Sequence, residues 1–170
     1  MKCLAVLAVL TAASTAHAEP VEVFSTQPLA LVGLGISAGY ERQLAERTSV
    51  VVLGGFRAPA LEDFSSGTIT LGGELRLWLR RASRLRGPYI AFHASAGYTR
   101  LSDEMGYIGS STGLTQRFDI GWRWVIRDRV SIAPSIGLGW REDIAGSGHL
   151  ATTARGMAAI GLELGWMRAR

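Results

Sequence analysis

The stretch that decides the fold is Ile69-Thr70-Leu71-Gly72-Gly73-Glu74-Leu75-Arg76-Leu77-Trp78-Leu79-Arg80. Apart from Gly73, its odd-numbered positions are apolar, whereas its even-numbered positions hold threonine, glycine, glutamate, tryptophan and arginine. Successive side chains of a β-strand point to opposite faces of the sheet. An alternation with a period of two therefore predicts a strand that has one apolar and one polar face.

The same alternation recurs in other segments of the chain. It is clearest at 114–126 and 130–141, and weakest at 48–57, where Val50 to Leu53 are all apolar. A strand needs about 9–11 residues to cross a membrane, and no apolar run here reaches the ~20 residues that a membrane-spanning helix needs. We therefore expect antiparallel strands at residues 30–41, 48–57, 68–80, 89–100, 114–126, 130–141 and 154–167.

An additional strand is expected before these segments. Bacterial single-chain barrels have even strand counts, so an odd count predicts one more strand. We expect that strand to open within residues 19–24 and to turn between residues 26 and 35, where Pro28 or Gly33 would mark the turn. The predicted fold is all-β, an eight-stranded antiparallel up-and-down transmembrane β-barrel.

The links between the segments differ in length and charge. Outer-membrane barrels have short periplasmic turns and longer extracellular loops. The longer links here each carry an adjacent acidic pair, whereas arginines gather in the shorter ones. The longer links are therefore expected to face the outside of the cell, where they could bind a surface partner or a divalent cation. The short links are 42–47, 81–87 and 127–129, and the longer ones are 58–67, 101–113 and 142–153.

Residues 1–18 have the pattern of a cleaved secretory signal. Lys2, the only lysine in the chain, precedes an apolar stretch, and Ala16-His17-Ala18 matches the A-x-A cleavage pattern. Cys3 is the only cysteine and would be removed with this segment. We therefore expect a signal peptide at 1–18, a barrel domain at 19–170, and export to the bacterial outer membrane.

Composition predicts which face of the strands lies inside. The polar face is rich in glycine and serine, and the narrow interior of an eight-stranded barrel admits small side chains. The same face carries charges of both signs, which can pair in a closed interior. We expect a lumen charge network of Glu74, Arg76, His93, Arg117, Asp119, Arg123, Arg141, Arg155 and Glu163. Aromatic residues near strand ends predict two interfacial belts, made of Tyr40, Phe56, Tyr98, Trp122, Trp124, Trp140 and Trp166.

Four sequence blocks carry a family resemblance. They are Ala38-Gly39-Tyr40-Glu41-Arg42, Gly73-Glu74-Leu75-Arg76-Leu77-Trp78, Gly121-Trp122-Arg123-Trp124 and Gly137-Leu138-Gly139-Trp140. Through them the chain resembles the small eight-stranded outer-membrane barrels, the class of the OmpA membrane domain and OmpX, and in particular an uncharacterised bacterial family of this type. The resemblance implies an outer-membrane location and an interior filled by side chains, and it brings no catalytic residue. Many such barrels end on an aromatic residue, whereas here Trp166 is followed by Met167-Arg168-Ala169-Arg170.

The expected function is a structural or surface-interaction role in the cell envelope, with a lumen plugged by side chains. No motif for catalysis, a cofactor or a metal ion stands out. The net charge of +4 is spread over many segments without a recognition helix, so nucleic acid is not an expected partner. Outer-membrane lipids are the expected surroundings of the barrel.

Two alternatives stay open at this point. His93-Ala94-Ser95 is similar to the His-x-Ser pair of outer-membrane lipid A deacylases, which would make the protein a lipid hydrolase that uses His93 and Ser95. A soluble lipocalin-like barrel also has alternating strands, but with its apolar face inside, and would carry apolar ligands.

Overall fold

Every regular element of the described chain is a β-strand. The computed structural model describes residues 21–28, 35–58, 60–61, 64–80, 85–103, 106–148 and 154–169, so the predicted signal segment 1–18 lies outside them. The strands are β1 (Val21–Thr26), β2 (Gly35–Ala45), β3 (Thr48–Arg57), β4 (Ala60–Leu61), β5 (Phe64–Trp78), β6 (Gly87–Asp103), β7 (Gly106–Ile126), β8 (Val130–Gly148) and β9 (Ala154–Ala169). In these ranges no helix has the length and apolar character needed to cross a membrane.

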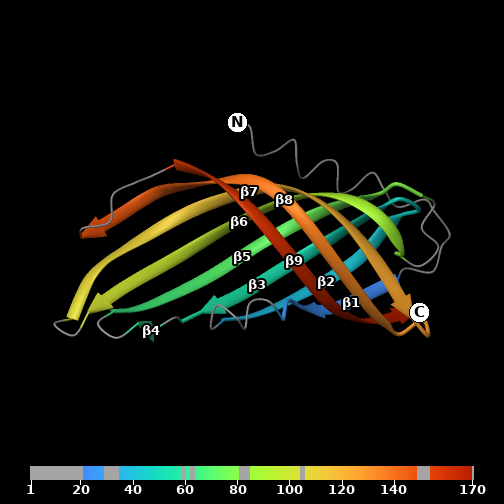
Figure 1. Cartoon of the computed structure of the whole chain (residues 1–170), viewed down its shortest axis with the longest axis horizontal. Coiled ribbons are helices and arrows are strands. Elements are labelled where there is room, and N and C mark those ends of the chain that lie inside the picture. Colours follow the sequence, from blue (N-terminus) through green and yellow to red (C-terminus); the bar gives the residue numbers. More distant parts are fainter. Residues whose placement is uncertain are drawn as a thin grey trace.

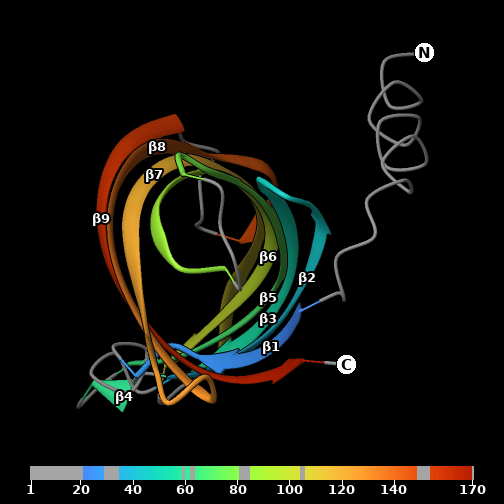
Figure 2. The same ribbon diagram turned by 90° about the vertical axis from the view of Figure 1, so that its right-hand side faces the viewer.

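Eight of the strands form a closed ring of antiparallel neighbours. Successive strands pair with one another, β3 pairs with β5, and β1 pairs with β9 to close the ring. The two-residue β4 pairs with the start of β5. Figure 1 shows the inclined strands from the side, and Figure 2 shows them surrounding a central space. The predicted up-and-down order of eight antiparallel strands is confirmed.

The ring has two ends that differ in their strands. We call one end the turn rim, because it holds the links 46–47 and 127–129, residues 79–80 and 85–86 between β5 and β6, and the outer ends of β1 and β9. It lies on the right in Figure 1. We call the opposite end the extended rim, because β6, β7 and β8 reach farthest there.

The strands at the extended rim are longer than the sequence predicts. β7 has 21 residues and begins at Gly106, and β8 has 19 and ends at Gly148. The expected loops 101–113 and 142–153 are therefore largely wrong, and 58–67 is shortened because β5 begins at Phe64. In these extensions small and polar residues occupy both faces, as in the pair Ser110↔Ser147, so no alternation marks them.

The N-terminal part of the ring follows the prediction more closely. β1 ends at Thr26, Pro28 lies in a turn, and β2 begins at Gly35, so the two strands are separate, as expected. Gly33, the other expected turn residue, lies outside the described residues. β1 pairs with β2 and β9 through Phe24↔Tyr40 and Phe24↔Trp166. The additional strand expected from the even strand count is therefore β1.

The apolar faces of the strands point away from the interior. Leu75, Ile120 and Ile136 are 47%, 62% and 63% exposed. Arg76 and Arg123, on the opposite face, are 2% and 0% exposed. The expected orientation of the two faces is confirmed, and it is the reverse of a globular protein, where large apolar side chains are mostly buried.

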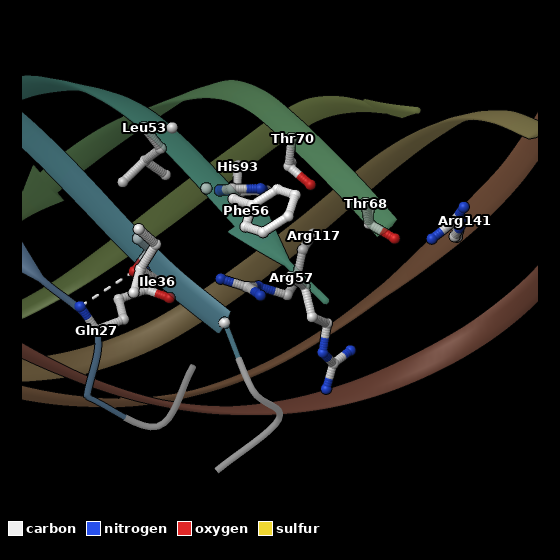
Figure 3. Close-up of a pocket in the computed structure, with 14 residues that line it drawn as sticks. Gln27, Ile36, Leu53, Phe56, Arg57, Thr68, Thr70, His93, Arg117 and Arg141 are labelled. Atoms are coloured by element: carbon white, nitrogen blue, oxygen red, sulfur yellow. Dashed lines mark hydrogen bonds between the residues drawn. The ribbon is translucent and has the colours of Figure 1, made fainter. Parts of the chain in front are cut away.

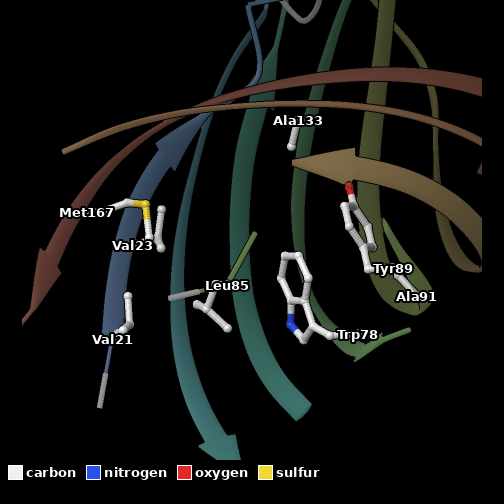
Figure 4. Packing of buried hydrophobic residues seen from close by; sticks show 8 residues of the cluster. All are labelled: Val21, Val23, Trp78, Leu85, Tyr89, Ala91, Ala133 and Met167. Atoms are coloured by element: carbon white, nitrogen blue, oxygen red, sulfur yellow. The ribbon is translucent and has the colours of Figure 1, made fainter. Parts of the chain in front are cut away.

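A small apolar cluster fills the interior at the turn rim (Figure 4). Leu85 belongs to the link 79–86, is fully buried, and has a left-handed φ of 50°. That conformation costs a non-glycine residue about 1–2 kcal/mol, which the burial of a leucine side chain offsets with a gain of similar size. The cluster consists of Val21, Val23, Trp78, Leu85, Tyr89, Ala91, Ala133 and Met167.

Candidate functional site in the ring interior

Next to the apolar cluster, the guanidinium of Arg76 is surrounded by carboxylates. Its Nε donates to Glu74 Oε1 at 2.5 Å and its Nη1 donates to Glu41 Oε2 at 2.8 Å. Its Nη2 donates to Glu163 Oε2 at 2.6 Å. Because the acids come from β5, β2 and β9, this arrangement exists only when the ring is closed.

Arg123 supplies the second cation of the same group. Its Nη2 donates to Glu41 Oε2 and to Glu163 Oε1, both at 2.6 Å. We call Arg76, Arg123, Glu41, Glu74 and Glu163 the interior ion cluster. It contains three carboxylates and two guanidiniums, which leaves one excess negative charge. Burial of such charges is tolerated when they are paired and hydrogen-bonded. Both guanidiniums here contact at least two carboxylates, but Arg123 bonds through Nη2 alone, and its Nε and Nη1 have no hydrogen-bond partner among the described residues.

Neighbouring side chains fix the cluster in place. Ser49 Oγ donates to Glu41 Oε1 at 2.5 Å, and Trp78 Nε1 donates to Ser49 Oγ at 3.1 Å. The Arg76 guanidinium lies 4.9 Å from the ring centre of Tyr89. That ring in turn lies against the backbone of Gly121, where a Cβ atom would collide with it. Glycine at 121 therefore provides the space in which the aromatic ring packs.

His93 joins the interior ion cluster to Ser95. His93 Nε2 and Ser95 Oγ are 3.1 Å apart, within hydrogen-bond range. His93 Nδ1 lies 3.7 Å from Glu74 Oε2 and has no hydrogen-bond partner. The order serine, imidazole, carboxylate is that of a nucleophile, its base and an orienting acid, although the second contact is longer than a hydrogen bond. Both side chains are on the inward face of β6.

Toward the extended rim the interior opens into a cavity of about 380 Å³ (Figure 3). Arg57, Arg117 and Arg141 contribute guanidinium groups to its lining. Arg117 Nε lies 2.8 Å from the carboxylate of Asp119. Arg141 Nε lies 3.1 Å from that of Asp143. The other lining residues are Gln27, Gly35, Ile36, Ser37, Leu53, Gly54, Gly55, Phe56, Thr68, Thr70 and His93.

Comparison with known proteins places the chain in a family. A family profile described as "Protein of unknown function (DUF3575)" matches residues 5–144. The chain belongs to the DUF3575 family. The matched region runs from before β1 through most of β8, so it contains Glu41, Arg76 and Arg123 but ends before Glu163. Comparison with curated proteins gives no match for this DUF3575 chain.

The interior of this DUF3575 chain divides the residues expected to form the lumen network. Glu74, Arg76, Arg123 and Glu163 meet in the interior ion cluster. Three other expected residues line the cavity, and a fourth, Asp119, pairs with Arg117 of the cavity lining. Arg155 is exposed near the extended rim, in register with Arg141. The three cavity residues are His93, Arg117 and Arg141, and the paired residue is Asp119.

Sequence reasoning did not assign three charged residues to the interior. Glu41 follows Gly35, Ser37 and Gly39 on one face of β2, and this run of small residues was the signal that would have identified it. Asp143 was expected in a loop with Glu142, but β8 continues past it and the carboxylate meets Arg141. Arg57 is the last residue of β3. The alternating pattern ends there, so it does not indicate to which face of the strand the Arg57 side chain belongs.

The expected belt residues lie mainly on the outer surface. Trp122, Trp124 and Trp166 are 41%, 53% and 57% exposed and lie toward the turn rim. Tyr40 is half-buried and packs on Phe24 at a ring distance of 5.2 Å. Phe56, Tyr98 and Trp140 lie toward the extended rim and are 47%, 48% and 43% exposed.

The longer links add little to the described site. The acidic residues at 62–63 and 104 lie outside the described ranges, as does His149. Across the residues that are described, no group of three His, Cys, Asp or Glu side chains could hold a metal ion. The interior therefore offers two candidate features, the His93–Ser95 pair and the arginine-lined cavity.

Proposed function

We propose that this protein is an outer-membrane β-barrel, exported with removal of residues 1–18, and that it has a structural or surface-interaction role. The observation that carries the proposal is the reversed distribution of its side chains. Large apolar residues such as Ile120 and Ile160 are 62% and 78% exposed on the outside, while charges occupy the inside. In water, so large an apolar surface would drive association, whereas acyl chains match it.

Strand length and the aromatic residues support the same proposal. β3 has 10 residues, which agrees with the ~9–11 that a tilted strand uses to cross a bilayer. The longer strands extend past this span at the extended rim, on the side proposed to face outward. Exposed tryptophans toward the turn rim and aromatic residues toward the extended rim match the two aromatic girdles of membrane barrels.

The interior favours a plugged barrel over an open pore. The interior ion cluster joins β2, β5, β7 and β9 across the ring through direct hydrogen bonds. Eight strands enclose a space that side chains can fill. We infer that the contacts of this protein with partners lie at the extended rim, within residues 58–67, 101–113 and 142–153, which include the extensions of β7 and β8.

A pair of arginine substitutions on the outer face tests membrane insertion. The cost of an arginine facing lipid is about 2–4 kcal/mol at the bilayer midplane and about 0–1 near the interface. Ile120 lies six residues before the turn-rim end of β7, within the span proposed to cross the bilayer, and the similarly exposed Ile144 lies near the extended rim in β8. We therefore expect Ile120→Arg to lower the yield of folded protein in outer-membrane fractions, and Ile144→Arg to leave it nearly unchanged.

The measurement is fractionation followed by gel mobility before and after heating. Wild-type protein should sediment with outer membranes and should migrate differently when boiled. Recovery of wild-type protein in the soluble fraction without detergent, or equal yields of the two variants, would refute membrane insertion.

A hydrolase is a second candidate, because Ser95 Oγ lies 3.1 Å from His93 Nε2. Both side chains face the interior, so a lipid in the surrounding bilayer would not reach them directly, and His93 but not Ser95 lines the described cavity. The test is deacylation of lipid A and of p-nitrophenyl butyrate by purified protein. Activity that Ser95→Ala abolishes and Ser135→Ala retains would support the hydrolase.

A carrier of apolar ligands is disfavoured by the same interior. Its larger cavity is lined by three arginines and two threonines, and the space beyond it is filled by the interior ion cluster. An apolar ligand there would remove water from charged groups without replacing their hydrogen bonds.

A further inference from the structure

The cavity at the extended rim concentrates positive charge. Arg57 comes from the end of β3, Arg117 from β7 and Arg141 from β8, so the guanidinium groups approach from three separate strands. Within the described lining there is no carboxylate. Figure 3 shows the three arginines with His93, Thr68 and Thr70 around the same hollow.

Two carboxylates contact cavity arginines from outside the described lining. Asp119 contacts Arg117 through Nε, and Asp143 contacts Arg141 through Nε. The described lining itself holds three guanidiniums and no carboxylate. In both contacts the carboxylate takes the Nε side of the arginine, and each guanidinium has further N–H donors on its Nη atoms.

The neutral groups of the lining are also able to donate hydrogen bonds. Thr68 and Thr70 supply hydroxyl groups from β5, and Gln27 supplies a side-chain amide from the end of β1. A volume of about 380 Å³ lies at the lower end of the range of small-molecule sites. Convergent arginines with hydroxyl donors are the groups that recognise oxyanions, because a guanidinium matches the geometry of a phosphate or carboxylate.

We propose that this cavity is a binding site for the phosphate or carboxylate group of a small anionic solute that enters through the extended rim. Arg57, Arg117 and Arg141 bind the oxyanion, and the threonine hydroxyls complete its hydrogen bonds. The interior ion cluster lies deeper in the ring than the cavity, and its three carboxylates disfavour entry of the anion beyond the cavity. This site goes beyond the proposed role in the envelope and does not depend on membrane insertion.

The test is calorimetric titration of the full mature protein with inorganic phosphate at low ionic strength, with sodium chloride at matched ionic strength as the blank. We expect saturable binding of phosphate and none of chloride. Arg57→Gln should weaken binding by about tenfold or more, because a charge-assisted hydrogen bond contributes ~1.5–3 kcal/mol and 1.4 kcal/mol corresponds to tenfold. Arg57 is suited to this test because its side chain is exposed and lies outside the interior ion cluster.

Arg100→Gln is the matched control. Arg100 is also exposed and lies toward the extended rim, but on the outer face of β6, so its loss removes the same charge without changing the cavity. Its phosphate affinity should equal that of wild type. Circular dichroism and gel mobility after heating check that each variant is folded.

Two competitors identify the source of the anion. Displacement of phosphate by glycerol 3-phosphate assigns the site to a small solute, whereas displacement by dihexanoyl phosphatidic acid alone assigns the same oxyanion chemistry to a lipid headgroup. Absence of saturable phosphate binding, or equal losses in Arg57→Gln and Arg100→Gln, would overturn the proposal. If the protein proves soluble without detergent, the same titration still tests the site, so the two proposals fail separately.

Discussion

The two halves of the ring interior are built by the same strands, but one half is tightly filled by side chains and the other contains a cavity. Near the turn rim, the space beside Glu74, Arg76 and Glu163 is only about 50 Å³, whereas the cavity toward the extended rim is about 380 Å³. β5 contributes Arg76 to the first half and Thr70 to the second. The comparison shows that the size of the inward side chains along a strand, rather than the strand number alone, decides where the interior is closed.

The two halves also differ in charge. The interior ion cluster has three carboxylates and two guanidiniums, whereas the described lining of the cavity has three guanidiniums and no carboxylate. Exposure follows the same division, because the side chains of Arg76 and Arg123 are 3% and 0% exposed, whereas those of Arg117 and Arg141 are 19% and 25% exposed. We call the half with the interior ion cluster the inner half and the half with the cavity the outer half, and the inner half is the more fully buried of the two.

The largest expected effect is loss of the central cation of the inner half. Arg76→Met leaves Glu74, Glu41 and Glu163 with a single guanidinium between them, and removal of one partner from a buried ion pair costs about 3–5 kcal/mol. Urea unfolding in detergent micelles, followed by circular dichroism, measures this loss. Arg117→Met, which removes one partner of Asp119 in the more exposed half, should cost clearly less. Equal losses in the two variants would mean that the halves do not differ in packing.

A smaller effect is expected from a single methyl group placed in each half. Gly121→Ala puts a Cβ into the ring of Tyr89, and overpacking of this kind costs about 1–3 kcal/mol. Gly97→Ala in the outer half meets Thr70 Oγ1 at 3.5 Å, an ordinary contact, and should be nearly neutral. Thermal unfolding of both variants compares the halves directly. A lower melting temperature for Gly97→Ala than for Gly121→Ala would contradict the assignment of the inner half as the packed one.

The smallest effect on stability is expected for the outer ion pair. Asp143→Asn removes the carboxylate beside Arg141, and a partly exposed pair of this kind contributes about 0–1 kcal/mol. The same change removes a negative charge next to the cavity, so phosphate should bind more tightly. Glu142→Gln changes the exposed neighbouring acid on the outer face and serves as the control. Weaker phosphate binding in Asp143→Asn would show that Asp143 holds Arg141 in its binding position.

Much of the fold was predictable because its signal is local. Each strand has different surroundings on its two faces, so the alternation in β5 identifies both the strand and its inward side chains, Glu74 and Arg76. The signal weakens where both faces carry small or polar residues. For that reason the extensions of β7 and β8 were expected to be loops, and Asp143 was placed in one of them.

The interior site was predictable only in outline. The alternation placed Arg76, Arg123 and Glu163 on the inward faces of their strands. It did not predict which of these charged side chains contact one another. The missing acid, Glu41, lies 35 residues from Arg76 along the chain, and its 2.8 Å contact with Nη1 depends on the closure of the ring. The burial of Leu85 was not predictable from alternation, because this residue lies outside the strands.

By itself, the sequence determined the strands, their antiparallel order and the face of each strand that is apolar, because these follow from the spacing of neighbouring residues. Only the tertiary structure decided which charges meet, that Leu85 and Trp78 close one end of the interior, and that three arginines share a cavity at the other. Those contacts join residues distant along the chain, and they are set by the register and curvature of the closed ring.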